Sequence, residues 1–109
     1  MPKPADLLQG TLDLLILKTL NREPLHGWGI AKRIQLLSGE ELSVGQGSLY
    51  PALHRLELRG DIVSEMAPSE NNRRARIYTL TKAGRQQLEA ETATWEQFSL
   101  SIKRVLRST

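Results

Sequence analysis

The side chains best suited to recognise another molecule through hydrogen bonds lie in one short segment, residues 45–60. Leu49, Leu53 and Leu56 recur there at spacings of four and three, which predicts one buried face of a helix. The polar side chains left on or near the free face are Gln46, Ser48, Tyr50, His54 and Arg55. Glutamine can pair with an adenine edge, and serine and tyrosine hydroxyls suit phosphate oxygens near a helix N-terminus. Any solvated helix also has a polar outer face, so this segment alone leaves a DNA-reading role and a plain surface open.

A second candidate site is the cluster of Arg73, Arg74 and Arg76. It lies at the end of a polar stretch between residues 62–66 and 76–80, where a period of two indicates short strands. The two runs predict a hairpin with a basic tip. Arginines in such a place can bind phosphates or enter a narrow minor groove. A charged run is most often only a solvated loop, but its position just after residues 45–60 favours a nucleic-acid role.

The sequence lacks the patterns that catalysis and metal binding require. There are no cysteines, and the two histidines, His26 and His54, lie far apart in the chain. His26 stands at the start of a helical segment, where capping or packing is its expected role. No nucleophile, base and orienting acid fall into a known arrangement, and no glycine-rich loop follows a strand. We therefore expect no enzyme, no metal and no cofactor.

Helical periodicity predicts the elements that position these residues. Apolar spacing indicates helices over residues 7–20, with Asp6 as N-cap, and over 27–38, with Ile30, Ile34 and Leu37 on its inner face. A third helix ends at Gly60, and Pro51 within it predicts an irregular or tight start over residues 45–50. A last helix follows from the cap at Thr81 to about residue 106.

Three helices, a hairpin and a final helix define the expected fold, which is mainly α with a small β wing. Residues 1–80 are expected to form a winged helix-turn-helix and residues 81–109 a long C-terminal dimerisation helix, within one structural domain. A length of 109 residues leaves room for one core, and a net charge of +3 permits binding to a polyanion. Without an apolar run long enough for a membrane or a secretory leader, we expect a cytoplasmic protein and no membrane partner.

The last helix predicts a second copy of the chain. At 1.5 Å per residue it would be about 40 Å long, more than a core of this size can cover. The residues expected at a dimer interface are Leu8, Leu12, Leu88, Thr92, Trp95, Phe98, Ile102 and Val105. Trp95 and Phe98 could also line a pocket for a small-molecule effector, although simple packing is the more ordinary role of such aromatic residues.

Four segments carry a family resemblance: GTLDLLIL at residues 10–17, HG at 26–27, GSLYPALHRLE at 47–57 and YTLTKAG at 78–84. Together they resemble the PadR family of transcriptional regulators, over nearly the whole chain. The resemblance implies a homodimer in which the third helix reads DNA, with Tyr50 facing the backbone, and the first and last helices form the interface. It also implies that Pro51 is tolerated early in the reading helix. Trp28 and Ile77 depart from the family's usual aromatic residues.

The resemblance further implies a repressor of the short subgroup with one C-terminal helix, and residues 69–75 look like an acidobacterial type. Such a dimer would bind a near-palindromic site, with half-sites spaced by about one helical turn or 34 Å, and Lys32 is expected to add a DNA contact. Control of a nearby transporter operon is an analogy with family members. The alternative is a winged-helix module that binds another protein; a neutral or acidic wing would favour it, and the arginine cluster argues against it.

Overall fold

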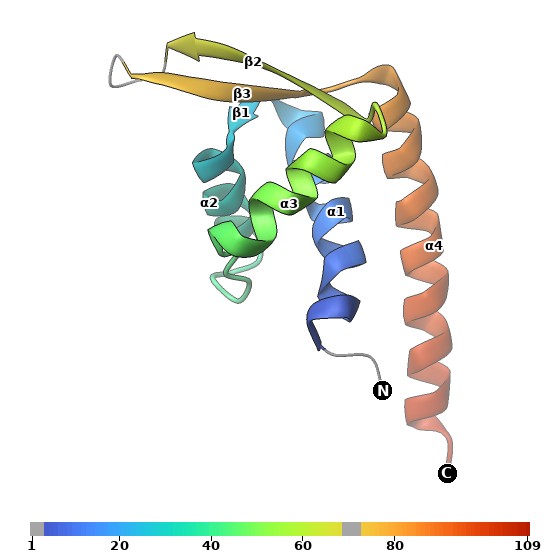
Figure 1. Ribbon diagram of the computed structural model, residues 1–109. Coiled ribbons are helices and arrows are strands. Elements are labelled where there is room, and N and C mark those ends of the chain that lie inside the picture. Colours follow the sequence, from blue (N-terminus) through green and yellow to red (C-terminus); the bar gives the residue numbers. More distant parts are fainter. Residues whose placement is uncertain (1–3, 69–72) are drawn as a thin grey trace.

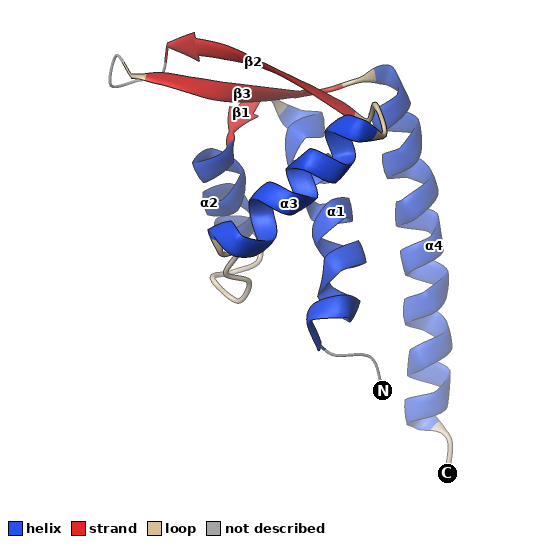
Figure 2. Cartoon of the chain, viewed as in Figure 1, coloured by secondary structure: helices blue, strands red, loops and turns tan. Residues whose placement is uncertain are grey.

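The computed structural model describes the backbone of residues 4–68 and 73–109, and the side chains of these ranges from residue 10 onward. Its elements, in chain order, are α1 (Pro4–Arg22), β1 (Leu25–His26), α2 (Gly27–Leu37), α3 (Gln46–Leu58), β2 (Ile62–Pro68), β3 (Arg74–Leu80) and α4 (Lys82–Arg107). The helices lie on one side of a small sheet, whose hairpin projects beyond them (Figures 1 and 2). This arrangement confirms the expected mainly helical fold with a β wing.

The described strands form one antiparallel sheet in the order β1-β3-β2. β2 pairs with β3 from Ile62 opposite Leu80 to Pro68 opposite Arg74, so the hairpin extends further toward its tip than the predicted strands. β1 was not predicted: it places Leu25 opposite Tyr78 and His26 opposite Ile77. A strand of two residues is too short to show a period. It joins the chain between α1 and α2 to the base of the wing.

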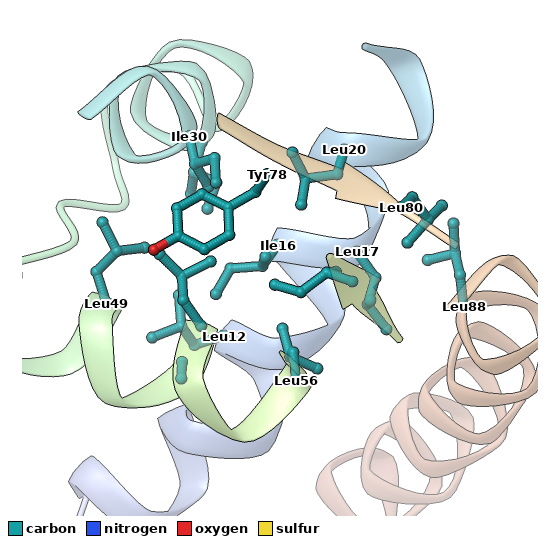
Figure 3. Packing of buried hydrophobic residues seen from close by; sticks show 14 residues of the cluster. Leu12, Ile16, Leu17, Leu20, Ile30, Leu49, Leu56, Tyr78, Leu80 and Leu88 are labelled. Carbon is teal, nitrogen blue, oxygen red and sulfur yellow. The ribbon is translucent and has the colours of Figure 1, made fainter. Parts of the chain in front are cut away.

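α1 lies at the centre of the core and contacts α2, α3, α4 and β3. Figure 3 shows the aliphatic side chains of these elements packed around Ile16 and Leu17, with the ring of Tyr78 among them. The buried apolar residues of the cluster are Leu12, Ile16, Leu17, Leu20, Ile30, Ile34, Leu49, Ala52, Leu53, Leu56, Ile62, Tyr78, Leu80 and Leu88. One core of this kind holds all the elements that carry the candidate site.

The first two helices differ from expectation at their ends. α1 begins at Pro4, so Asp6 lies inside the helix and is not its N-cap. α2 begins after His26, whose Nδ1 accepts a hydrogen bond from the Gly29 N–H at 3.0 Å, so the capping interpretation is confirmed. At the other end Leu37 is exposed, because the helix stops there and its last turn extends past the core.

α3 is α-helical from Gln46 onward, so the irregular start is confined to its first turn. The Gly45 carbonyl accepts from the Ser48 N–H at 3.2 Å and from the Leu49 N–H at 3.0 Å, a tight turn that opens into a regular helix. Pro51, in the second turn, has no N–H to donate to the carbonyl of Gly47. Both residues are exposed, so water can satisfy that carbonyl. The proline is tolerated because it lies on the solvent side.

α4 starts against the turn that follows α3. Thr81 Oγ1 accepts from the Gly84 N–H at 3.0 Å, which confirms the predicted cap. A Cβ on Gly84 would overlap the carbonyl oxygen of Asp61, so only glycine allows this approach. α4 then runs beside α1 in the opposite direction, and it continues along one edge of the molecule, which measures 58 × 28 × 24 Å (Figure 1).

Candidate nucleic-acid interface

The outer face of α3 carries the polar side chains that the spacing predicted. Leu49, Leu53 and Leu56 are buried, and the helix therefore turns its opposite side to solvent. The exposed predicted residues on that side are Gln46, Ser48, Tyr50 and His54. They extend from the N-terminus of the helix, where free backbone N–H groups favour a phosphate, to its third turn.

Tyr50 joins this face to the start of α2. A Cβ on Gly27 would lie 2.9 Å from the Tyr50 hydroxyl, so the phenol covers the backbone of that glycine. The pair accounts for two separate sequence motifs, because the glycine after His26 makes room for the tyrosine before Pro51. The N-terminal ends of α2 and α3 are thus held together at one surface.

Arg55 differs from the other predicted residues of α3, because an ion pair holds it. Its Nη2 donates to Asp13 Oδ1 at 2.9 Å, and the contact draws the guanidinium toward α1. Sequence reasoning missed Asp13. The available signal was an acid within the leucine-rich run of α1, since a buried carboxylate needs a cationic or hydrogen-bonding partner.

The arginines of the wing lie on a defined face of the sheet. Arg76 is opposite Met66 and Arg74 is opposite Pro68 in the antiparallel register. Because strand side chains alternate, both arginines share the face of buried Tyr78, which is the helix side of the sheet. Arg73 is exposed just before β3. The rest of the predicted basic tip, residues 69–72, lies outside the described residues.

A hydrogen-bonded chain fastens this wing to α3. Arg76 Nη1 donates to Ser64 Oγ at 3.0 Å, and Ser64 Oγ donates to Glu57 Oε1 at 2.9 Å. Burial raises the pKa of Tyr78 on the same strand, and the negative charge of Glu57 raises that pKa further. The base of the wing therefore keeps a fixed position relative to α3.

Lys32 on α2 is exposed and lies over an aromatic ring. Its Nζ is 5.1 Å from the centroid of Trp28, which is 65% exposed. The distance is within the range of a cation–π contact. Trp28 therefore holds the lysine at the surface, beside the N-terminal end of α2.

The predicted dimer residues fall into two groups. Leu12 and Leu88 are buried in the core of the chain itself, so they are corrected from interface to core residues. The side chain of Leu8 lies outside the described residues. Thr92 is half-buried, and its Oγ1 donates to the Leu88 carbonyl at 2.7 Å. Exposed apolar side chains remain at Trp95, Phe98, Ile102 and Val105, which are between 41% and 72% exposed.

Two further observations concern other kinds of site. Among the side chains of residues 10–68 and 73–109, no group of three or more acidic or histidine residues is placed to hold a metal ion. Within the described backbone, residues 4–68 and 73–109, no helix combines the length and the apolar character needed to span a membrane.

Three helices, a projecting hairpin and an exposed polar face on α3 define the winged helix-turn-helix class. The model of the transcriptional regulator PadR-like family matches residues 16–90, which is more than half of the chain. The chain belongs to the PadR-like family of DNA-binding transcriptional regulators. The family resemblance is thereby confirmed, as is the expectation that the chain is not an enzyme, because the family consists of regulators.

Relatives in sequence agree with this membership. An uncharacterised 37.1 kDa protein from a Streptomyces fradiae transposon is 41% identical over 86 residues, which are 79% of this chain and 23% of that protein. A transcriptional regulator of Mycobacterium tuberculosis is 38% identical over 68 residues, which are 62% of this chain and 63% of the regulator. The chain thus spans less than two thirds of the length of either relative.

Solved structures show the same fold. A transcriptional regulator from Clostridium thermocellum has a TM-score of 0.83 and 28% identity, covering 91% of this chain and 96% of its own. A PadR family regulator from Clostridium difficile has a TM-score of 0.73 and 29% identity, covering 87% and 97%. A PadR family regulator from Eggerthella lenta has a TM-score of 0.79 and 28% identity, covering 95% and 88%.

Proposed function

We propose that this chain binds a near-palindromic operator in duplex DNA as a homodimer, with α3 of each copy in the major groove. The observation that carries the proposal is the division of α3 into a buried leucine face and an exposed face of hydrogen-bonding side chains. Gln46 and His54 are suited to base edges, and Ser48 and Tyr50 to phosphate oxygens.

The wing and α2 supply the cations of this interface. Arg73, Arg74 and Arg76 are exposed, and the link from Arg76 through Ser64 to Glu57 ties the base of the wing to the reading helix. Lys32 adds a charge beside the start of α2. Contacts of this type bind phosphates of any sequence and so place the reading helix in the groove. Arg55 is left out of the proposed contacts because Asp13 holds it.

The second copy is proposed to cover the apolar stripe of α4, which we define as Trp95, Phe98, Ile102, Val105 and Leu106. These residues recur at helical spacing, and all are exposed in the single chain. Such a contiguous apolar surface is typical of a protein interface. The proposed dimer would hold two copies of α3 at a fixed separation, which a two-fold symmetric operator requires.

Repression, effector response and location in the cytoplasm complete the proposal. A dimer bound across an operator would block transcription there, and a ligand between the two copies of Trp95 and Phe98 would change the separation of the reading helices. Support for repression and for control of a nearby transporter operon comes from the family resemblance. The exposure of both aromatic rings is the structural support for an effector pocket.

The wing is tested by replacing Arg73, Arg74 and Arg76 together with alanine. The probe is the duplex that the wild-type chain enriches from a random-sequence pool. We expect affinity for this duplex to fall strongly, and the magnitude of the slope of log K against log salt to decrease by up to about 3, because three phosphate contacts are removed. Sedimentation should still give a dimer of the 12.3 kDa chain.

The matched control replaces Lys103, Arg104 and Arg107 with alanine. These residues are exposed near the C-terminal end of α4 and carry the same charge of +3. The control should bind the enriched duplex as the wild type does. Equal losses in both variants would mean that only net charge matters, and loss of the dimer in the wing variant would contradict the assignment of the wing. A chain that dimerises but binds no duplex would support the protein-interaction alternative.

A further inference from the structure

Asp13 is a buried acid of α1 that holds two arginines from α3 and its C-cap. Its Oδ1 accepts from Arg55 Nη2 at 2.9 Å, and its Oδ2 accepts from Arg59 Nη2 at 2.9 Å. The Asp13 side chain is 11% exposed, whereas both guanidinium groups reach the surface. Each carboxylate oxygen thus binds one arginine, and the two arginines lie one helical turn apart. Such a contact resists both rotation and sliding of α3 along α1.

The same end of α3 is also held to α4. Arg59 Nε lies 3.9 Å from Oδ2 of buried Asp61, an atom with no hydrogen-bond partner among the described residues. The Asp61 carbonyl accepts from the Thr81 N–H at 3.0 Å, and the Gly60 carbonyl accepts from Thr81 Oγ1 at 2.7 Å. The turn after α3 is therefore fixed by charges to α1 and by hydrogen bonds to the start of α4.

The ion pairs add a restraint that the apolar face of α3 lacks. Leucines such as Leu53 and Leu56 are closely packed but make no directional bonds, whereas the two arginine contacts fix an angle as well as a distance. A buried ion pair adds little net stability, because desolvation offsets the attraction between its charges, but it can specify one arrangement over others. Side chains that recognise a ligand must be held within about 0.5 Å of the productive geometry.

We propose that Asp13 is a positioning residue for DNA recognition: through Arg55 and Arg59 it sets the orientation of α3, and with it the choice of DNA sequence. The inference rests on the proposed function. It assigns to Asp13 an effect on the ratio of affinities for the enriched duplex and an unrelated duplex. Binding that depends on phosphates alone does not need this orientation.

The test is Asp13→Asn, which keeps the size of the side chain but removes its charge and one acceptor oxygen. In the folded variant, confirmed by circular dichroism, we expect affinity for the enriched duplex to fall at least ten-fold. Affinity for an unrelated duplex should be unchanged. The matched control is Glu23→Gln, which removes the same charge from an exposed ion pair with Arg33, away from α3. This control should leave the affinity ratio at the wild-type value.

Two results with a folded Asp13→Asn variant would overturn the inference. One is a ratio of affinities for the enriched and the unrelated duplex that equals the wild-type ratio. The other is a ratio that falls only because the freed arginines bind the unrelated duplex more tightly. If this variant does not fold, Arg59→Gln decides in its place. The Arg59 side chain is 45% exposed, and Arg55 would still pair with Asp13. A ten-fold lower ratio then supports the inference, and an unchanged ratio overturns it. If the wild-type chain enriches no duplex, the proposed function itself fails, and the inference fails with it.

Discussion

At the scale of single residues, Tyr78 places a phenol in the core next to an acid. Its side chain is 5% exposed, and burial together with the charge of Glu57 raises its pKa above the ordinary value of about 10. In the folded chain the phenol keeps its proton at a pH where the unfolded chain loses it. The stability that results is present below about pH 10 and is lost as the pH rises through the folded pKa.

Tyr78→Phe should remove this dependence. We expect the free energy of unfolding of the wild type to fall more steeply between about pH 9 and pH 11 than that of the variant, because only the wild type has the buried Tyr78 phenol with its raised pKa. Urea unfolding, followed by circular dichroism at several pH values, measures the difference. Parallel curves for the two proteins would contradict the raised pKa.

Single residues also show what periodicity can and cannot predict. The exposure of Gln46, Tyr50 and His54 follows from leucine spacing, because the buried side of a helix determines its free side. The ion pair of Arg55 cannot be predicted from spacing, because its partner Asp13 is 42 residues away in the chain. A contact of that range depends on how α1 packs against α3, which no local pattern contains.

At the scale of elements, the sequence predicts the long periodic segments but not the short or unusual ones. The four helices and the hairpin follow from apolar spacing and caps such as Thr81. β1 is defined by its partner strand and has no pattern of its own. Pro51 suggested a longer irregular start, yet α3 remains regular because the proline faces solvent. In both cases tertiary context decides the local structure.

The α4 element carries the prediction about assembly. Phe98→Glu places a charge in the middle of the apolar stripe, and we expect it to convert the dimer to a monomer at micromolar concentration, because an unpaired charge would be buried in the interface. Sedimentation equilibrium measures the mass, which should change from twice the chain mass to 12.3 kDa.

Gln97→Glu is the matched control, because the adjacent position turns away from the stripe and gains the same charge. It should remain a dimer. A dimeric Phe98→Glu variant would place the interface elsewhere.

At the scale of the whole molecule, the order of the helices and strands predicts the fold class. The length of α4 predicts that a single chain cannot cover the apolar face of this helix. Within α4 only Gly84 and Leu88 are buried, although the helix runs along the long dimension of the molecule (Figure 1). The burial of Leu12 and Leu88 in the core of their own chain cannot be predicted. An apolar stripe on a helix does not indicate whether the same chain or a second copy covers it. The proposed site is likewise complete only in an assembly with two reading helices.

The reading of DNA by α3 is best tested by selection of duplexes from a random pool by the wild-type chain, followed by titration of the enriched duplex at several salt concentrations. We expect a near-palindromic sequence with half-sites spaced by about 34 Å. Binding should resist unrelated competitor DNA and weaken as salt rises, because phosphate contacts release counterions. Enrichment of no sequence, with equal affinity for every duplex, would contradict the claim that α3 reads DNA.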